Sequence, residues 1–276
     1  MQRTIFLYLV LLIFPFISPA QSTAKEWYKK GIELKDKKDH ENALIAFRNA
    51  ISKDAKYNDA YYQAGQCSNE LEKFEDAIDY LKKFNPASNE SKRDKYNSLG
   101  FAYFNLHNAK DAIEQYNQVL SFLPNNGTAL RGLGNVYYDI AEDHDSALIY
   151  FEKLLEADEE ASIPVCYKIA WLYNENERYD DAIRILLKAI QYDSEDSGYR
   201  EELGYAYYMK EEYEFALTQL NKAISLDENS NLGYYYKGLC FVATNKKGEA
   251  MSIYYKLKEL ASDEADALLE KINQMK

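Results

Sequence analysis

The chain has few of the residues that reactive sites and covalent cross-links require. Of its 276 residues, three are cysteines, three are histidines and five are prolines. The sequence contains no glycine-rich phosphate loop, no His-Glu-x-x-His motif and no nucleophile elbow of the Gly-x-Ser-x-Gly type. We therefore predict a protein that is not an enzyme and that holds no cofactor and no metal ion.

Positive charge is scarce as well. The sequence has 33 basic and 45 acidic residues, which gives a formal net charge of −12. A negative balance of this size keeps an extended protein soluble and opposes binding to nucleic acid or to an anionic lipid surface. We expect no nucleic-acid partner.

One long apolar run is present, at the start of the chain. Residues 1–20 combine the basic Arg3, an apolar run over residues 5–17, and small residues at Ser18 and Ala20. This order is typical of a secretory signal peptide cleaved before Gln21. The run is too short for a membrane span, which needs about 20 residues. We predict an exported protein of the bacterial periplasm, or alternatively a secreted one, without stable membrane insertion; an uncleaved anchor is the alternative.

The rest of the chain is built on a repeat. A small residue returns every 34 to 36 positions, and an alanine follows it twelve positions later, or thirteen in the fourth unit. The small residues are Gly31, Gly65, Gly100, Gly134, Ala170, Gly204 and Gly238, and the alanines are Ala43, Ala77, Ala112, Ala147, Ala182, Ala216 and Ala250. A constant period of this length is typical of stacked helix pairs.

Each unit reads as two amphipathic helices joined by a short polar turn. In the first unit Trp27, Gly31 and Leu34 share one helical face, and Ala43 and Phe47 share another. A glycine inside a helix costs roughly 1 kcal/mol relative to alanine, so its recurrence needs a packing reason. We expect the small residue to lie where the two helices cross, with the glycine packed against the repeated alanine. Helix axes lie about 8–10 Å apart, and the distance depends on the side chains between them.

The repeat resembles the tetratricopeptide repeat, whose pattern places an aromatic residue, Leu-Gly and a tyrosine in the first helix and alanine, an aromatic residue and a closing proline in the second. The third unit carries this pattern most fully, at Tyr96, Leu99, Gly100, Tyr103, Ala112, Tyr116 and Pro124. The resemblance implies an all-α solenoid of seven helix-turn-helix units that forms a right-handed superhelix and ends in a capping helix.

The repeats divide residues 21–263 into seven units, at about 24–57, 58–92, 93–126, 127–162, 163–196, 197–230 and 231–263. Residues 264–276 form the predicted cap, whose apolar stripe consists of Leu268, Leu269, Ile272 and Met275. One extra residue enters the turn at 142–146, and a longer polar link covers 85–92. In most units an aspartate, rather than proline, ends the second helix; these are Asp54, Asp158, Asp193 and Asp227.

The three cysteines do not suggest a disulfide. Cys67, Cys166 and Cys240 fall in the second, fifth and seventh units, and stacked helix pairs place those units far apart. A disulfide requires Cα atoms within about 7 Å. We expect three small, buried, unpaired side chains.

In the resembling family the first helix of each unit lines the concave side, and its face away from the core meets the ligand. Carried onto this chain, that assignment selects a row rich in aromatic residues with a few amides, a composition typical of protein interfaces. The candidate partner-binding residues are Tyr62, Asn97, Phe101, Phe104, Arg131, Asn135, Tyr138, Tyr167, Trp171, Tyr205, Tyr208 and Tyr235. The alternative is that these rings pack between adjacent first helices and only thicken the wall of the solenoid.

Family members that bind chaperones grip a C-terminal carboxylate with lysine, asparagine and arginine side chains of three consecutive units. Here Arg131 and Asn135 reproduce only the first half of such a clamp, and Lys168 stands where the next asparagine belongs. We do not expect this mode of binding.

The leading hypothesis is a non-enzymatic scaffold of the cell envelope that binds a protein or peptide partner in a concave groove. Two alternatives remain open: a structural subunit of an envelope or secretion assembly, and a carrier of glycans that stack on the aromatic row. The identity of the partner and the oligomeric state do not follow from the sequence.

Overall fold

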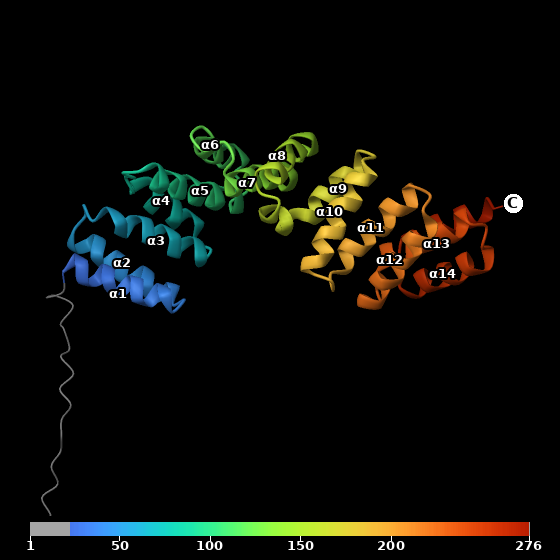
Figure 1. The fold of residues 1–276 in the computed structure, drawn as a ribbon. Coiled ribbons are helices and arrows are strands. Elements are labelled where there is room, and N and C mark those ends of the chain that lie inside the picture. The colour runs from blue at the N-terminus through green and yellow to red at the C-terminus, as the bar shows by residue number, and fades with distance from the viewer. Residues whose placement is uncertain (1–22, 276) are drawn as a thin grey trace, which may run out of the picture. The chain divides into compact units, whose positions relative to one another are not determined.

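The computed structural model describes residues 23–275. Within this range all regular structure is helical, with fifteen α-helices and one short 3₁₀-helix (Figure 1). The chain divides into two compact units, the first ending at Val119 and the second beginning at Leu120. The predicted signal peptide, residues 1–20, and its cleavage point before Gln21 lie outside the described residues.

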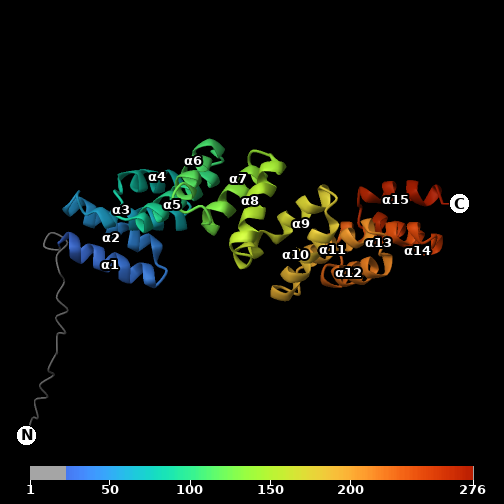
Figure 2. The same ribbon diagram turned by 45° about the horizontal axis from the view of Figure 1, so that its top comes forward.

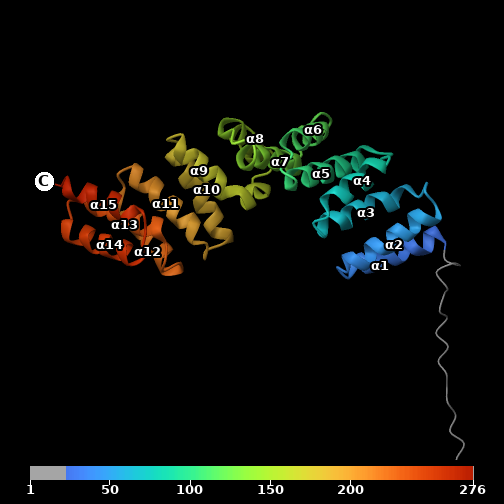
Figure 3. The same cartoon turned by 180° about the vertical axis from the view of Figure 1, so that it is seen from behind.

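Unit 1 consists of three helical hairpins. Its helices are α1 (Ala24–Asp36), α2 (His40–Lys53), α3 (Asn58–Glu70), α4 (Phe74–Lys83), α5 (Asn89–Asn105) and α6 (Ala109–Leu120). The second helix of one hairpin packs on the first helix of the next, as α2 does on α3 and α4 on α5 (Figure 3). The first helices α3 and α5 also touch each other directly.

Unit 2 continues with four hairpins and a final helix. Its helices are α7 (Gly127–Asp139), α8 (His144–Ala157), η1 (Glu160–Val165), α9 (Cys166–Glu175), α10 (Tyr179–Tyr192), α11 (Ser197–Met209), α12 (Tyr213–Leu226), α13 (Asn231–Ala243), α14 (Lys247–Glu259) and α15 (Glu264–Asn273). The first helices α9, α11 and α13 touch in sequence, α9 with α11 and α11 with α13. The predicted all-α architecture of paired helices is therefore confirmed within each unit.

The six hairpins whose small residue is glycine contain the close approach that these residues predict, although its partner differs from the expected one. A Cβ added at Gly100 would lie 2.7 Å from Cε1 of Tyr116, and one at Gly204 would lie 2.5 Å from Cγ of Leu220. Both partners lie four residues after the repeated alanine. The glycine thus makes room for a large side chain from the next turn of the second helix, and the predicted contact between glycine and alanine is not the closest one.

The turn inside each hairpin uses a left-handed residue, and in none of the seven described turns is it glycine. The non-glycine residues with positive φ in these turns are Lys38, Glu72, His107, Glu142, Glu177, Glu211 and Asn245. The backbone N–H after the left-handed residue bonds back into the first helix, as Asn108 N donates to Tyr103 O at 2.9 Å. Because the left-handed conformation costs about 1–2 kcal/mol for a residue with a Cβ, tertiary packing must hold these turns.

The fourth hairpin confirms the predicted insertion. In the other turns the returning N–H bonds a carbonyl five residues back, whereas Asp143 N bonds Tyr137 O, six residues back. The extra residue is accommodated before the left-handed Glu142, which keeps φ at 52°. Helix α8 then begins normally, with the Asp143 carboxylate accepting from Ser146 N at 3.0 Å. The insertion therefore lengthens only the turn.

The polar link predicted over residues 85–92 is shorter than expected, which corrects the sequence interpretation. Helix α5 begins at Asn89, because Ser88 forms an N-terminal capping box with Ser91. The Ser88 side chain accepts from Ser91 N at 3.1 Å, and Ser91 Oγ accepts from Ser88 N at 3.0 Å. The cap converts half of the predicted link into the first turn of a helix.

The last hairpin is covered by α15, which lies against α13 and α14 (Figure 2). Leu268 and Ile272 are fully buried, and Leu268 Cδ2 lies 2.5 Å from the position of a Cβ on Gly238. Leu269 and Met275 are only half-buried. Helix α15 thus covers the apolar face of the seventh hairpin, as the first helix of a further repeat would do.

Two smaller predictions are also confirmed. Cys67, Cys166 and Cys240 are buried and unpaired, and burial raises the pKa of Cys67 and Cys166 to about 11 and that of Cys240 to about 12. Such thiols are protonated and inert at neutral pH. The aspartates expected at the ends of second helices are C-cap residues in extended conformation, at Asp54, Asp158, Asp193 and Asp227.

We predict that Gly100→Ala lowers the free energy of unfolding by about 1–3 kcal/mol, because the added Cβ overlaps the ring of the buried Tyr116. The matched control is Gly248→Ala in α14, where a Cβ would meet nothing within 4 Å. Urea titrations of both variants test the packing. Equal stabilities would show that the close approach in the hairpin is not what requires glycine.

Candidate binding face on the first helices

The predicted site residues of unit 2 lie on four first helices. Tyr138 belongs to α7, Tyr167 and Trp171 to α9, Tyr205 and Tyr208 to α11, and Tyr235 to α13. We call these six residues the aromatic row. Tyr167 is 39% exposed, and the other five are half-buried. Residues at the same helices' core positions, such as Ala170 and Leu203, are fully buried.

Neighbouring rings within the row are in contact. Tyr138 and Trp171 meet edge to face, with ring centroids 5.8 Å apart, and the ring of His144 lies 5.1 Å from Trp171. Tyr205 lies 4.9 Å from Tyr236, which in turn contacts Tyr235 at 5.7 Å. The rings therefore pack between adjacent first helices, as the alternative interpretation expects, and still keep partly exposed surface; that they bind a partner stays a prediction.

The two residues that resemble half of a carboxylate clamp are occupied within the chain. Arg131 Nη1 donates to Ala161 O at 3.4 Å. Asn135 Oδ1 accepts from Lys168 Nζ at 3.1 Å, and the same ammonium lies 2.6 Å from Asp139 Oδ2. Lys168 Nζ also lies 5.2 Å from the ring centroid of Tyr138. Each of these three side chains therefore has a polar partner within the chain.

The predicted site residues of unit 1 lie on α3 and α5. Tyr62 is half-buried against Phe84 at 5.2 Å, and burial, followed by the charge of Asp94, raises its pKa to about 12. Phe101 is 46% exposed and contacts Phe74 edge to face at 6.1 Å. Asn97 and Phe104 are half-buried. In this unit the exposed aromatic surface is limited mainly to Phe101.

A second set of residues joins neighbouring first helices and was not recognised in the sequence. These residues lie two positions before the small residue of a repeat, and we call them junction residues; those with described contacts are Gln63, Ser98, Lys168, Glu202 and Tyr236. Gln63 Oε1 accepts from Lys35 Nζ at 2.7 Å, and Ser98 Oγ accepts from Gln66 Nε2 at 2.5 Å. The junction position therefore forms the contact between first helices in each case.

Asparagines on the preceding first helix reach the same position. Asn69 Nδ2 donates to Ser98 O at 3.1 Å, and Asn174 Nδ2 donates to Glu202 O at 3.4 Å and to Glu202 Oε2 at 2.8 Å. Both asparagines lie at positions of the first helices where the sequence interpretation expects amides interspersed in the exposed aromatic row. The structure buries them, at 7% and 2% exposure, so they hold adjacent repeats together instead.

Glu202 is the unusual junction residue, because it is a carboxylic acid only 6% exposed. Burial raises its pKa, against the hydrogen bonds from Asn174 and from the Tyr167 hydroxyl, and the charges of Glu201 and Glu175 raise it further. Its side-chain hydrogen bond comes from the neutral Asn174 amide, and no ion pair of the described residues includes this carboxyl.

Several tyrosines surround this carboxyl. Burial, followed by the charges of Glu202 and Glu201, raises the pKa of Tyr167 to about 12. Burial is again the largest cause of the raised pKa of Tyr236, and the Glu202 charge is the next. Glu202 also contributes, after burial and other neighbours, to the raised pKa values of Tyr138 and Tyr205. The carboxyl thus lies among hydroxyls and rings from α7, α9, α11 and α13.

The sequence offered only a weak signal for Glu202 and Tyr236. The junction position holds residues of different chemistry in different repeats, so its recurrence is visible only in register with the glycines. A glutamate on an otherwise amphipathic helix is read as exposed by default, because ionised side chains are rarely buried. The tertiary contact with Asn174 decides its burial, and periodicity does not report that contact.

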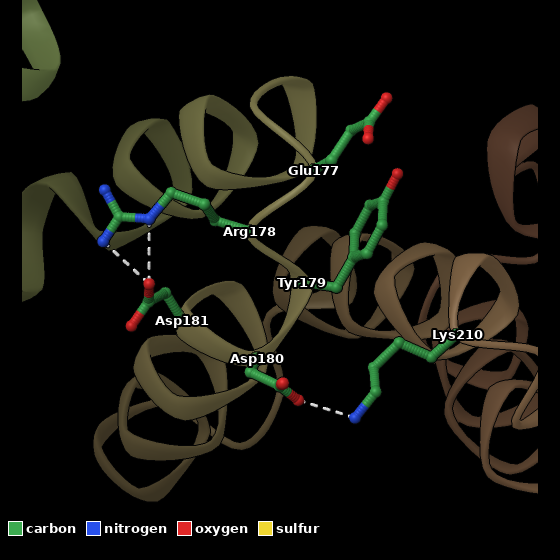
Figure 4. A pocket seen from close by; sticks show the side chains of 6 residues that line it. All are labelled: Glu177, Arg178, Tyr179, Asp180, Asp181 and Lys210. Atoms are coloured by element: carbon green, nitrogen blue, oxygen red, sulfur yellow. Dashed lines mark hydrogen bonds and ion pairs between the residues drawn. The ribbon is translucent and has the colours of Figure 1, made fainter.

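A polar depression of about 340 Å³ lies at another edge of unit 2 (Figure 4). Its lining includes two ion pairs: Lys210 Nζ lies 2.6 Å from Asp180 Oδ1, and Arg178 Nη2 lies 2.7 Å from Asp181 Oδ2. The remaining lining residues are Glu177 and Tyr179. Because its basic groups are neutralised by adjacent carboxylates, this depression offers little charge for a ligand.

Residues 23–275 contain no group of three or more histidine, cysteine, aspartate or glutamate side chains that could hold a metal ion. None of the helices in that range combines the length and the apolar character that crossing a bilayer demands.

The sequence profile of the tetratricopeptide repeat family matches residues 28–91, 98–162 and 167–231. These segments make up more than half of the chain, and the chain belongs to the tetratricopeptide repeat family. The resemblance stated from the sequence is confirmed.

Among curated proteins, the TPR repeat-containing protein MJ1428 of Methanocaldococcus jannaschii is 23% identical over 260 residues, which cover 89% of this chain and 45% of that protein. The chain thus spans less than half the length of this relative. A solved tetratricopeptide repeat protein from Parabacteroides merdae is 19% identical with a TM-score of 0.56, over 91% of this chain and 99% of that one. YrrB, a TPR protein with an unusual peptide-binding site, is 18% identical with a TM-score of 0.52, over 82% and 98%. At these identities the solved structures show the fold alone.

We predict that Glu202→Gln becomes more stable than the wild type as the pH rises. The folded-state pKa of this carboxyl lies above its unfolded value of about 4.3. The protonated carboxyl therefore makes its full contribution to the free energy of unfolding below the unfolded pKa. This contribution is lost as the pH rises through the folded pKa. Glutamine carries no charge at any pH.

Urea titrations at about pH 4 and pH 8 provide the measurement. The stability difference between Glu202→Gln and wild type should be small at the lower pH and favour the variant at the higher one. Glu156→Gln, an exposed change on α8, serves as the control and should show no such trend. A difference that does not change with pH would mean that Glu202 is solvated in the folded chain.

Proposed function

We propose that this chain is a non-enzymatic scaffold that binds a protein or peptide partner through the aromatic row. The observation that carries the proposal is the partly exposed row on consecutive first helices, whose opposite side packs in the hairpins. Large aromatic rings are enriched at protein interfaces, where a few aromatic anchors supply most of the binding energy. The peptide-binding site described for YrrB, a protein of the same fold, supports a peptide as the class of ligand.

We further propose that the scaffold acts in the bacterial cell envelope, most simply in the periplasm. The support is the N-terminal sequence, in which a basic residue, the apolar run over 5–17 and a small-x-small site precede Gln21. Mass spectrometry of the protein released by osmotic shock should find a chain that starts at Gln21. A membrane-bound protein that retains residues 5–17 would contradict export by a cleaved signal peptide.

Replacing Trp171 and Tyr205 together by alanine tests the binding face. A central aromatic anchor typically costs about 2 kcal/mol or more on truncation, so the pair should weaken binding by about several hundredfold. In-cell crosslinking and mass spectrometry first identify the partner of the wild-type chain. Titration of that purified partner against both chains then gives the affinities, and the melting temperature should fall only slightly.

The matched control replaces Phe215 and Tyr255 by alanine. These rings are 60% and 64% exposed, but they lie on the second helices α12 and α14. They should leave the affinity unchanged. Loss of binding in the control alone would place the site on the second helices. That result would favour the alternative that the chain is a structural subunit whose partner contacts the second helices. Strong destabilisation of Trp171→Ala/Tyr205→Ala with intact binding would assign the row to the core.

A further inference from the structure

The junctions of unit 2 differ in one chemical respect. Between α7 and α9 the chain supplies its own cation: the Lys168 ammonium lies on the Tyr138 ring and against the Asp139 carboxylate. Between α9 and α11 the corresponding junction residue is Glu202, again beside tyrosines. The first junction thus contains ammonium, ring and carboxylate, whereas the second contains ring and carboxylate only.

The helices around this second junction carry three basic residues, Lys168 on α9, Arg200 on α11 and Lys237 on α13. Lys168 and Arg200 are engaged elsewhere. Arg200 donates to Ser194 O and to Gln219 Oε1. Burial alone lowers the pKa of Lys237, and no carboxylate contributes to it. Among the described residues, none of the three forms an ion pair with Glu202.

An unsatisfied acceptor lies beside the carboxyl. The Asn174 side chain is 2% exposed, and its Nδ2 bonds Glu202, while its Oδ1 has no hydrogen-bond donor among the described residues. A buried acceptor without a donor costs about 1–3 kcal/mol. Glu202 and Asn174 together therefore present acceptors that N–H groups would satisfy. Tyr167 lies beside Glu202 and is 39% exposed, so this ring reaches from the neighbourhood of the carboxyl to solvent.

Resting on the function proposed above, we propose that the aromatic row recognises a basic segment of its protein partner and seats a lysine or arginine side chain at the junction of α9 and α11. The cation replaces the Tyr167 hydroxyl at Glu202, donates to Asn174 Oδ1 and lies against the rings of Tyr167 and Tyr205. Attraction between a cation and an aromatic face strengthens as water is excluded. Glu201, half-buried on the same helix, adds negative charge. The net charge of −12 steers a basic partner toward the chain.

The probe is a pair of synthetic peptides of identical length, one rich in lysine and one with every lysine replaced by N-acetyl-lysine. Binding is followed by the fluorescence of Trp171 in a Trp27→Phe background, which leaves this single tryptophan in the row. The lysine peptide should change the fluorescence and the acetylated one should not. Glu202→Gln should weaken binding by about tenfold or more, as expected for a lost charge-assisted contact. Glu156→Gln, the same change of charge on the exposed side of α8, should have no effect.

Glu201→Gln is the second variant and should weaken binding to a smaller extent, so that the inference can be tested even where Glu202→Gln is poorly folded. Equal binding of both peptides, or equal loss with Glu202→Gln and Glu156→Gln, would overturn the basic specificity while leaving the binding face intact. A response of Trp171 to oligosaccharides, with none to the lysine peptide, would overturn it in favour of a glycan ligand. A separate experiment tests the proposed function itself. If the natural partner binds Trp171→Ala/Tyr205→Ala with unchanged affinity, the aromatic row is not the binding face.

Discussion

The structure depends on one steric constraint, the fit of a large side chain against a glycine of the first helix, which recurs in six of the seven hairpins. At Gly100 and Gly204 a single Cβ would already overlap Tyr116 or Leu220. This fit sets how closely the two helices cross, and its recurrence in successive hairpins gives them a common geometry. The last hairpin keeps the same constraint at Gly238, although there Leu268 of the capping helix contributes the side chain.

Because the glycine side of each first helix is used within its hairpin, the remaining sides are left for neighbours and for partners. Junction residues occupy one of these sides, where Glu202 meets Asn174 across adjacent first helices. The aromatic row occupies the side next to it, with Tyr167 the most exposed ring. A buried carboxyl therefore lies directly beside the surface proposed to bind the partner, and the chemistry of the junction contributes to the specificity of that surface.

The sequence predicted the features that the hairpin packing imposes, since packing produces the spacing. Helix pairs, buried cysteines and aspartate C-caps follow from it. The turns were harder, because residues such as Glu72 and Glu211 adopt positive φ without the glycine that normally signals it. The start of α5 depended on a local serine cap. The burial of Glu202 depended on a contact between separate repeats, and Asn69 and Asn174 were misplaced for the same reason. Local pattern does not contain such contacts.

Side-chain oxidation by hydroxyl radicals, compared with and without the bound partner, tests the central claim most directly. It reads the solvent exposure of individual aromatic rings in the intact chain. The account predicts that binding protects Tyr167, Trp171 and Tyr205 on the first helices and leaves Phe215 and Tyr255 on the second helices unchanged. Protection of Phe215 and Tyr255 with continued oxidation of Tyr167 would contradict it.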